Sequence, residues 1–400
     1  MNYRIRNKWV VVFGALSSQL AIGALYAWSL FNRPISEAFG WDIADVVLTY
    51  QIALATFALT MILSGRMQLT KGPRLTSLIG GILYSGGVLL SSFATTPIML
   101  YLTYGVITGA GVAFVYVCQL ATLVKWFPHR KGMITGLATA GFAMGGFTFK
   151  LILTRLFDVP VYTPELVSGV FLTVGVIFAV MAIGGALLLD VPEEGHEAHK
   201  IKVPEGKDYT RKEMLHTGNF YKLLVSDLFA LMPGLLVIGL AKDIGQDMAG
   251  MDYYAASAIV GTIALVNAAG RLASGTLADK LGALNVYRAM YVVTIISLGV
   301  LAFVSMTPTI FIIAIMGIAV GYGSFLSLVP TIVGKLFGAK YFSANYSLIF
   351  LAYGVAAMIG PSIKRVSTGF DQTFMIAMGT AIVGLAFAMM IKEKKVEKKA

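Results

Sequence analysis

Residues Trp9 to Leu30 read WVVVFGALSSQLAIGALYAWSL and include no charged side chain. About 20 apolar residues in a helix are enough to cross the roughly 30 Å hydrocarbon core of a bilayer. Runs of this kind recur along the 400-residue chain, which is 57% hydrophobic and only 13% charged, whereas soluble domains average about a quarter charged residues. The sequence therefore predicts a polytopic membrane protein, and the length of the first run favours a retained helix over a cleaved signal peptide.

Apolar runs separated by polar breaks predict an all-α protein with twelve transmembrane helices. The expected spans are 9–30, 46–64, 75–93, 98–122, 133–153, 166–189, 221–241, 253–274, 287–305, 309–333, 345–363 and 373–391. An even number of spans places the two ends of the chain on the same side of the membrane.

Lys and Arg are distributed unequally between the two sides of these spans. Arg271 falls inside a span, and only six of the 31 Lys and Arg residues fall on the side opposite the termini: Arg33, Lys150, Arg155, Lys242, Lys364 and Arg365. Cytoplasmic loops carry the excess of Lys and Arg in membrane proteins. Both termini are therefore expected in the cytoplasm, in the inner (cell) membrane of a bacterium or archaeon. The net charge of +11 is explained by these loops, so no nucleic-acid partner is expected.

The polar segment from Asp190 to Phe220 divides the chain into two halves. The predicted organisation is an N-terminal six-helix bundle at 1–190, a cytoplasmic linker at 191–220 and a C-terminal six-helix bundle with a basic cytoplasmic tail at 221–400. The halves match each other at an offset of 210 residues, as in the pairs Gly65 and Gly275, Gly72 and Gly282, and Gly111 and Gly321. Repeated six-helix halves are typical of transporters whose substrate path lies between the halves.

The segment Gly275-Thr-Leu-Ala-Asp279-Lys280-Leu-Gly282 resembles the cytoplasmic loop signature of the major facilitator superfamily. Its first-half counterpart runs from Gly65 to Gly72-Pro-Arg74 and has Leu69 where the family usually has Asp. In the family this Asp takes part in a cytoplasmic gate, so the departure puts symmetric gating in doubt. The resemblance implies gating or motif roles for Gly275, Asp279, Lys280, Gly282, Gly72 and Arg74.

Further motifs narrow the resemblance. They are Tyr26-Ala-Trp28-Ser, Gly109-Ala-Gly111 running to Tyr116, Trp126-Phe-Pro-His-Arg-Lys-Gly132, Asn267-Ala-Ala-Gly-Arg271 and Ser343-Ala-Asn345-Tyr346. Together they resemble the oxalate:formate antiporter family and its relatives, the monocarboxylate transporters. The resemblance implies a secondary active transporter that moves a small organic anion by alternating access. It does not imply an enzyme.

Arg271 is the main candidate for substrate recognition. A charged side chain inside the membrane costs from about 2.5 to more than 10 kcal/mol, so such residues normally face a cavity and meet a partner. A guanidinium binds a carboxylate through two parallel hydrogen bonds, and the resemblance implies this role for Arg271. The alternatives are that Arg271 reaches the inner headgroups or pairs with Asp279. Asn267 lies one turn before Arg271 on the same helix face and could orient it or contact substrate.

The resemblance also implies an aromatic pocket around the anion. The matching positions are Tyr26, Tyr116, Phe142, Tyr322, Phe350 and Tyr353, although any one of these rings could simply pack between helices. The oxalate:formate antiporter has a Lys where this chain has Tyr353. One central cation balances one carboxylate, so a monocarboxylate such as lactate, pyruvate or formate is expected rather than oxalate.

Proton coupling is left open. Proton-coupled animal relatives have Asp at the position of Asn267. The intramembrane carboxyl of this chain is Asp227 instead, and we expect it to pair with a loop base rather than to relay protons.

No Walker phosphate loop, metal-ligand cluster or nucleophile triad occurs in the sequence, so no cofactor and no use of ATP are expected. The competing functions are an oxalate:formate-type anion exchanger and, in a different class, a transporter-like nutrient sensor.

Overall fold

The computed structural model describes residues 7–192 and 207–392, and within these ranges it is helical with no strands. Eleven helical stretches of the described residues are long and apolar enough to cross a membrane. A further 29-residue helix, α13 (Tyr253–Leu281), covers the predicted eighth span. The all-α membrane fold is therefore confirmed. The middle of the predicted linker, 193–206, and the predicted basic tail, 393–400, lie outside the described residues.

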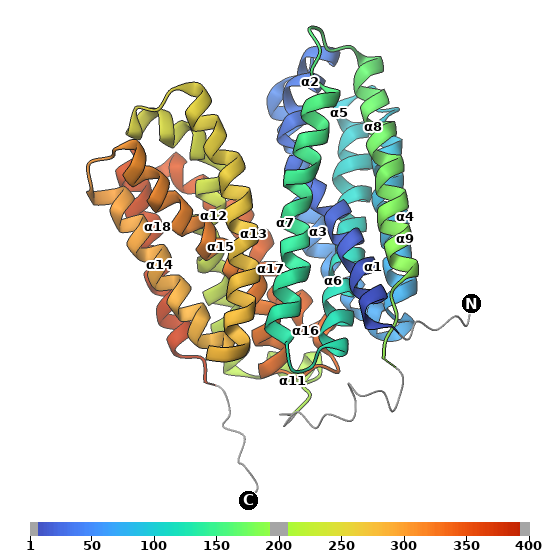
Figure 1. Cartoon of the computed structure of the whole chain (residues 1–400), viewed down its shortest axis with the longest axis vertical. Helices are drawn as coiled ribbons and strands as arrows, with labels where there is room; N and C mark the ends of the chain where they lie inside the picture. The colour runs from blue at the N-terminus through green and yellow to red at the C-terminus, as the bar shows by residue number, and fades with distance from the viewer. Residues whose placement is uncertain (1–6, 193–206, 393–400) are drawn as a thin grey trace, which may run out of the picture. The chain divides into compact units, whose positions relative to one another are not determined.

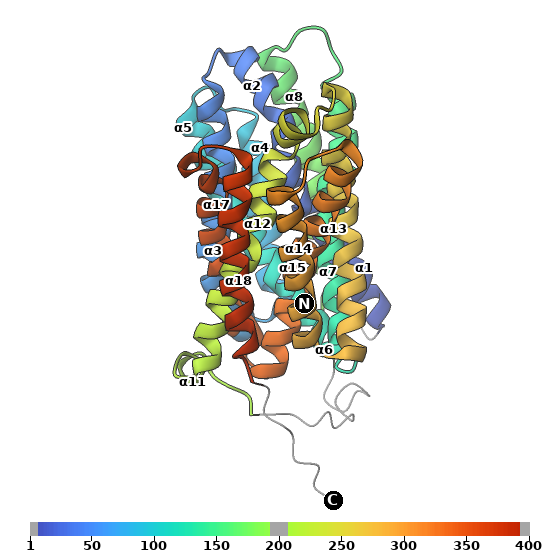
Figure 2. The ribbon, with the colours of Figure 1, turned by 90° about the vertical axis from the view of Figure 1, so that its left-hand side faces the viewer.

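The chain forms two compact units, and the described residues of the first are 7–128 and 141–192. Its helices are α1 (Lys8–Gly23), η1 (Ala24–Ala27), α2 (Ser29–Phe39), α3 (Ile43–Lys71), α4 (Pro73–Ser91), α5 (Pro97–Leu100), η2 (Tyr101–Thr108), α6 (Gly109–Trp126), α8 (Pro164–Phe178), η3 (Ala179–Ile183) and α9 (Gly184–Leu187). Within this unit α6 packs against α1, α3 and α4. At one end of the unit α2 packs against α8 (Figure 2).

The second unit contains residues 129–140 and the described residues from 207 onward. Its helices are α11 (Arg211–Leu215), α12 (Gly218–Ala249), α13, α14 (Ala283–Phe303), α15 (Pro308–Leu336), α16 (Phe342–Ile349), α17 (Leu351–Ser362), η4 (Ile363–Val366) and α18 (Phe370–Met389). Helix α7 (Lys131–Leu156) begins in this unit and continues in the first. Helix α15 packs against α12, α13 and α14, and α14 lies beside α18 (Figure 1).

Several helices start with the same two-residue signal. In the pairs Thr96-Pro97, Thr163-Pro164 and Thr307-Pro308, the Thr side chain accepts a hydrogen bond from the backbone N–H three residues later. The Pro occupies the first helical position, where its missing N–H removes no intrahelical bond. These local signals fix where α5, α8 and α15 begin.

Many helices extend beyond the predicted spans. The predicted spans 46–64 and 253–274 end before the motif segments, but α3 continues to Lys71 and α13 to Leu281. The expectation that these motifs form loops is therefore wrong, because hydropathy detects only the part of a helix that crosses the hydrocarbon. The chain turns instead at Gly72 (φ 82°) and Gly282 (φ 87°), where a side chain would be strained. Two left-handed glycines at equivalent positions support the internal repeat.

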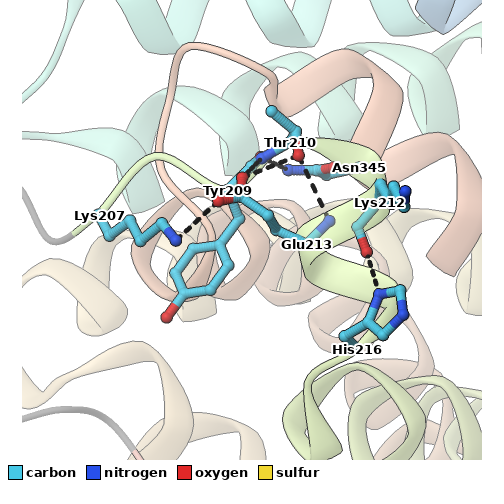
Figure 3. A network of polar contacts seen from close by, with 7 residues as sticks. All are labelled: Lys207, Tyr209, Thr210, Lys212, Glu213, His216 and Asn345. Carbon is cyan, nitrogen blue, oxygen red and sulfur yellow. Dashed lines mark hydrogen bonds and ion pairs between the residues drawn. The ribbon is translucent and has the colours of Figure 1, made fainter.

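The described end of the linker binds the start of α16 (Figure 3). We call residues 207–210 the linker clamp. The Tyr209 N–H donates to the Phe337 carbonyl at 2.9 Å, and Nδ2 of Asn345 donates to the Tyr209 carbonyl at 2.8 Å. Oδ1 of Asp208 accepts the N–H of Lys340 at 3.2 Å. The linker is thus an integral part of the second unit at this point.

Candidate functional site

Arg271 is buried in the second unit, with 1% of its surface exposed. Its Nε donates to Oδ1 of Asn267 at 2.8 Å, and its Nη1 donates to the carbonyl oxygen of Thr139 at 2.8 Å. Nη2 is also buried and has no hydrogen-bond partner among the described residues. Arg271 neither reaches solvent nor bonds to Asp279, so the two alternatives considered for it from the sequence are not what the structure has. The guanidinium is held on two edges and free at Nη2.

Glycines let the backbones around Arg271 approach closely. A Cβ on Gly136 of α7 would lie 2.5 Å from the Arg271 carbonyl oxygen, and one on Gly323 of α15 would lie 2.3 Å from the Asn267 carbonyl oxygen. Contacts shorter than about 3 Å exclude any larger residue at these two positions. Helix α13 therefore packs closely against α7 at Gly136 and against α15 at Gly323. This close backbone packing sets the positions of Asn267 and Arg271.

The predicted aromatic residues of the second unit pack between its helices. Phe350 and Tyr353 are stacked, with ring centroids 5.0 Å apart and an interplanar angle of 19°. Phe350 sits at the junction of α16 and α17, so the stack marks the point where this span changes from one helix to the next. Tyr322 lies against Gly234 of α12, whose Cβ would fall 2.3 Å from the Tyr322 ring. All three rings are buried.

The predicted aromatic residues of the first unit form one cluster. Phe142 meets Tyr26 edge to face at 5.0 Å and Tyr116 at 5.4 Å between ring centroids. Phe57 of α3 completes the cluster, 5.5 Å from the ring of Tyr116 and 6.5 Å from that of Phe142. Sequence reasoning missed Phe57, because one Phe within an apolar helix looks like any of the chain's 24. The structure thus brings together the three residues expected on this side.

The position of Tyr26 follows from close packing of α1 on α7. A Cβ on Gly23 would lie 1.9 Å from the Phe142 carbonyl oxygen, and one on Gly145 would lie 2.2 Å from the Leu20 carbonyl oxygen. Directly after Gly23 the helix tightens into the 3-10 turn η1, which carries Tyr26. Because the backbones nearly touch, the Tyr26 ring meets Phe142 edge to face.

Sequence and fold comparisons assign the family. The sequence model of the Major Facilitator Superfamily matches residues 9–361, and a second match covers residues 223–400. The chain belongs to the Major Facilitator Superfamily. Members of this superfamily are membrane transporters, so the chain is a transporter rather than an enzyme.

Relatives within the superfamily confirm the resemblance inferred from the motifs. The chain is 31% identical to the uncharacterized MFS-type transporter YhjX of Escherichia coli, over 89% of this chain and 87% of that protein. It is 24% identical to the oxalate:formate antiporter of Oxalobacter formigenes, over 96% of this chain and 91% of that protein. Identity to monocarboxylate transporter 13 of Bos taurus is also 24%, over 94% and 87% of the two chains.

Solved structures agree on the fold. The proton:xylose symporter XylE superposes with a TM-score of 0.77 at 12% sequence identity, and the match covers 97% of each chain. At this identity the likeness shows the fold alone. It assigns this chain the architecture of a Major Facilitator Superfamily transporter.

The superfamily motif in the second half forms a helix cap. Asp279 accepts hydrogen bonds from the backbone N–H groups of Gly132 and Met133 at the start of α7, both at 2.8 Å. Gly275 allows this approach, because its Cβ would lie 2.3 Å from the Gly132 carbonyl oxygen. A carboxylate at a helix N-terminus is favoured by the unpaired N–H groups and the helix dipole. Lys280 is exposed beside the cap.

The first-half motif, which ends at Gly72-Pro-Arg74, makes a different contact from the Asp279 cap of the second half. Arg74, which follows the Gly72 turn, donates from Nη2 to Oδ2 of Asp190 at 3.0 Å and from Nε to the Leu189 carbonyl at 2.9 Å. Nε1 of Trp126 donates to the Asp190 carbonyl at 2.7 Å. Arg74 therefore anchors the residues that follow α9, where the linker begins. The half-buried Leu69 has no carboxylate with which to cap a helix.

Proposed function

We propose that this transporter carries a small monocarboxylate, such as lactate, pyruvate or formate, by alternating access, and that Arg271 binds the carboxylate. The observation that carries the proposal is the buried Nη2 of Arg271, which has no partner among the described residues. A buried charged donor left unpaired costs upward of about 1–3 kcal/mol. A bound anion would remove that cost.

The free edge of Arg271 fits a carboxylate. Nε and one hydrogen of Nη1 are already used by Asn267 and Thr139. The second hydrogen of Nη1 and both hydrogens of Nη2 remain, and these two nitrogens present the parallel pair of donors that a carboxylate accepts. Asn267 then acts as a positioning residue, because its bond to Nε sets the plane of the guanidinium.

The charge of the site favours one carboxylate over two. Among the side chains that the structure describes, Arg271 is the only buried Lys, Arg or His. Tyr353 occupies the position for which the resemblance implies a second cation in an oxalate carrier. The names of the relatives, an oxalate:formate antiporter and monocarboxylate transporters, support a carboxylate as the substrate class.

We place both termini in the cytoplasm of a bacterial or archaeal cell. The unequal distribution of Lys and Arg supports this orientation. The cluster of Tyr26, Tyr116 and Phe142 in the first unit, and Tyr322 and the stacked pair Phe350 and Tyr353 in the second, are the aromatic residues that we propose to contact the anion. The Asp279 cap on α7 would be made and broken as the cytoplasmic side closes and opens.

The test is uptake of radiolabelled lactate, pyruvate, formate and oxalate into proteoliposomes. Arg271→Lys keeps the charge but loses the fork of donors, and we expect uptake to fall roughly 10- to 100-fold, the equivalent of one charged hydrogen-bond pair. Arg33→Lys is the matched control, since Arg33 is exposed and pairs with Glu37. Unchanged uptake by Arg271→Lys would refute the assignment of Arg271. Uptake of oxalate in preference to the monocarboxylates would favour the exchanger.

A further inference from the structure

The second unit buries one carboxyl group as well as one guanidinium. Among the side chains that the structure describes, Asp227 and Arg271 are the only buried Asp, Glu, Lys, Arg or His residues, at 4% and 1% exposure. Asp227 lies on α12 and Arg271 on α13. Within residues 7–192 and 207–392, no ion pair involves either of them. The buried charges of this unit are therefore one of each sign, held separately.

Asp227 does not have the basic partner expected from the sequence. Its Oδ1 is buried without a hydrogen-bond partner among the described residues. The adjacent Ser226 hydroxyl lies 3.1 Å from the hydroxyl of Tyr287 and 3.2 Å from that of Tyr291, and it donates to the Gly384 carbonyl at 3.0 Å. Both phenols lie within electrostatic range of Asp227.

The other ionisable groups on the elements around α12 are engaged elsewhere. Arg288 of α14 donates to the carbonyls of Ala388 and Ile391, and Lys222 of α12 donates to that of Met390. On the other elements packed against α12, Arg271 bonds to Asn267 and Thr139, Asp279 caps α7, and the rings of Tyr322, Tyr346 and Tyr353 pack on Gly234, Phe342 and Phe350. Among the described side chains of α11, α12, α13, α15 and α18, Glu213 pairs with Lys207, Arg211 is half-buried, and the exposed groups are Lys212, His216, Tyr221, Asp247, Lys280, Lys335 and Asp371. The groups that face Asp227 are thus the two tyrosines.

We propose that Asp227 is the proton-binding site of this transporter and that one proton crosses with each acid anion. This inference rests on the proposed function of the chain. A carboxylate removed from water and without a cation is far costlier to bury than a carboxyl, so the buried group holds a proton. Oδ1 takes a proton from water on the side where the anion enters and returns it to water on the side where the anion leaves.

Charge neutrality gives the coupling. With the anion on Arg271 and a proton on Asp227, the buried groups carry no net charge. After the anion has left and Asp227 has returned its proton to water, the positive Arg271 and the negative Asp227 again sum to zero. Either ligand alone leaves one uncompensated charge inside the membrane, which is costly to move across it. Only the fully loaded and the empty carrier therefore change sides readily, and proton and anion are carried together.

A metal cation fits this place poorly. Cations such as Ca²⁺ and Mg²⁺ need six or more oxygen ligands, whereas the hydroxyls of Ser226, Tyr287 and Tyr291 already bond to each other and to backbone carbonyls. Oδ1 of Asp227 is the free oxygen at this place. One oxygen is enough for a proton.

The first experiment detects the proton directly. Infrared difference spectra of the purified full-length protein at neutral pH should show the C=O stretch of a protonated carboxyl. The band should be lost in Asp227→Asn and kept in Asp371→Asn, a control that removes an exposed carboxyl from the same unit. A spectrum with no such band, or a band that persists in Asp227→Asn, would overturn the proposal whatever the substrate is.

The second experiment measures coupling in proteoliposomes. An inward proton gradient should drive accumulation of the labelled acid by the wild type and by Asp371→Asn. Asp227→Asn imitates the protonated carboxyl, so we expect gradient-driven uptake to fall by roughly tenfold or more while exchange of internal for external acid falls much less. Equal losses of both activities, or accumulation driven by a Na⁺ gradient, would refute the proton site. Absence of any exchange by the wild type would defeat the proposed substrate, and the infrared band would still decide the role of Asp227.

Discussion

Asp279 accepts the backbone N–H groups of Gly132 and Met133 at 2.8 Å each, so one carboxylate caps the start of α7 with both of its oxygens. The cap belongs to the second-half motif alone, because Leu69 stands at the equivalent position of the first half. The start of α16, which corresponds to the start of α7 at an offset of 210 residues, is held instead by the linker clamp. The starts of α7 and α16 occupy equivalent places in the repeat, but different contacts hold them: the Asp279 cap for α7 and the linker clamp for α16.

The first prediction concerns this cap. Asp279→Asn removes the charge and one acceptor oxygen, and loss of such a cap costs about 0.5–2 kcal/mol. We expect faster deuterium uptake in the peptide covering 131–136, measured by mass spectrometry. Asp158→Asn, which changes an exposed carboxyl outside any described ion pair, should leave the peptide unchanged. Unaltered exchange in Asp279→Asn would show that the cap does not stabilise the start of α7.

The second prediction concerns the linker clamp. Gly338 has φ 85°, and its Cβ would lie 2.1 Å from Oδ1 of Asp208. We expect Gly338→Ala to release residues 207–210 from α16, seen as new proteolytic cleavage in the linker. Gly250→Ala is the control, since Gly250 also has a positive φ of 61° but nothing within 4 Å of its Cβ. Both variants carry the backbone strain of about 1 kcal/mol, so equal cleavage would mean that the contact with Asp208 is unimportant.

The third prediction is a pH dependence of the same region. The side chain of Lys207, which lies 2.7 Å from Glu213, lowers the pKa of Glu213 from 4.5 to about 2, and the N–H and hydroxyl of Thr210 add to the effect (Figure 3). A carboxyl with a lowered pKa stabilises the folded form fully above its unfolded value, near 4.5, and loses this contribution as the pH falls toward 2.

Amide exchange of residues 207–216, corrected for the intrinsic effect of pH, should therefore stay constant from about pH 8 to about pH 5 and increase in more acidic solution. Glu213→Gln should show weaker protection already at neutral pH and little further change in acid. An acid transition of the same size in Glu213→Gln would assign the effect to another group.

A structural feature could be predicted from the sequence where residues adjacent in the chain determine it. The apolar runs, the Thr-Pro helix starts and the turns at Gly72 and Gly282 follow from residues adjacent in the chain, and these features were predictable. The burial of Arg271 was also predictable, because it lies within an apolar span. Its bond to the Thr139 carbonyl joins residues 132 positions apart, and a backbone acceptor has no signature in sequence.

The same reasoning explains what was missed. Phe57 of α3 joins the cluster through ring contacts with Tyr116 of α6 and Phe142 of α7, and contacts of this kind leave no pattern in a uniformly apolar helix. The linker clamp was overlooked because a short polar segment reads as solvent-exposed loop, although Tyr209 is half-buried and bonded through its backbone at both ends. The expected partner of Asp227 was wrong because nearby bases bond to helix-end carbonyls instead.

The last prediction tests the charge argument for substrate choice. Tyr353→Lys places a second cation on the face of α17 that stacks on Phe350, and a hydrogen bond to a charged group contributes about 1.5–3 kcal/mol. Competition by oxalate against labelled monocarboxylate should then improve by roughly tenfold or more, while monocarboxylate uptake itself weakens because the added cation is left unpaired. Tyr353→Phe keeps the stacking without adding charge, so it should retain the preference of the wild type. If oxalate competes no better in Tyr353→Lys than in Tyr353→Phe, position 353 lies outside the anion site and the count of cations does not set the selectivity.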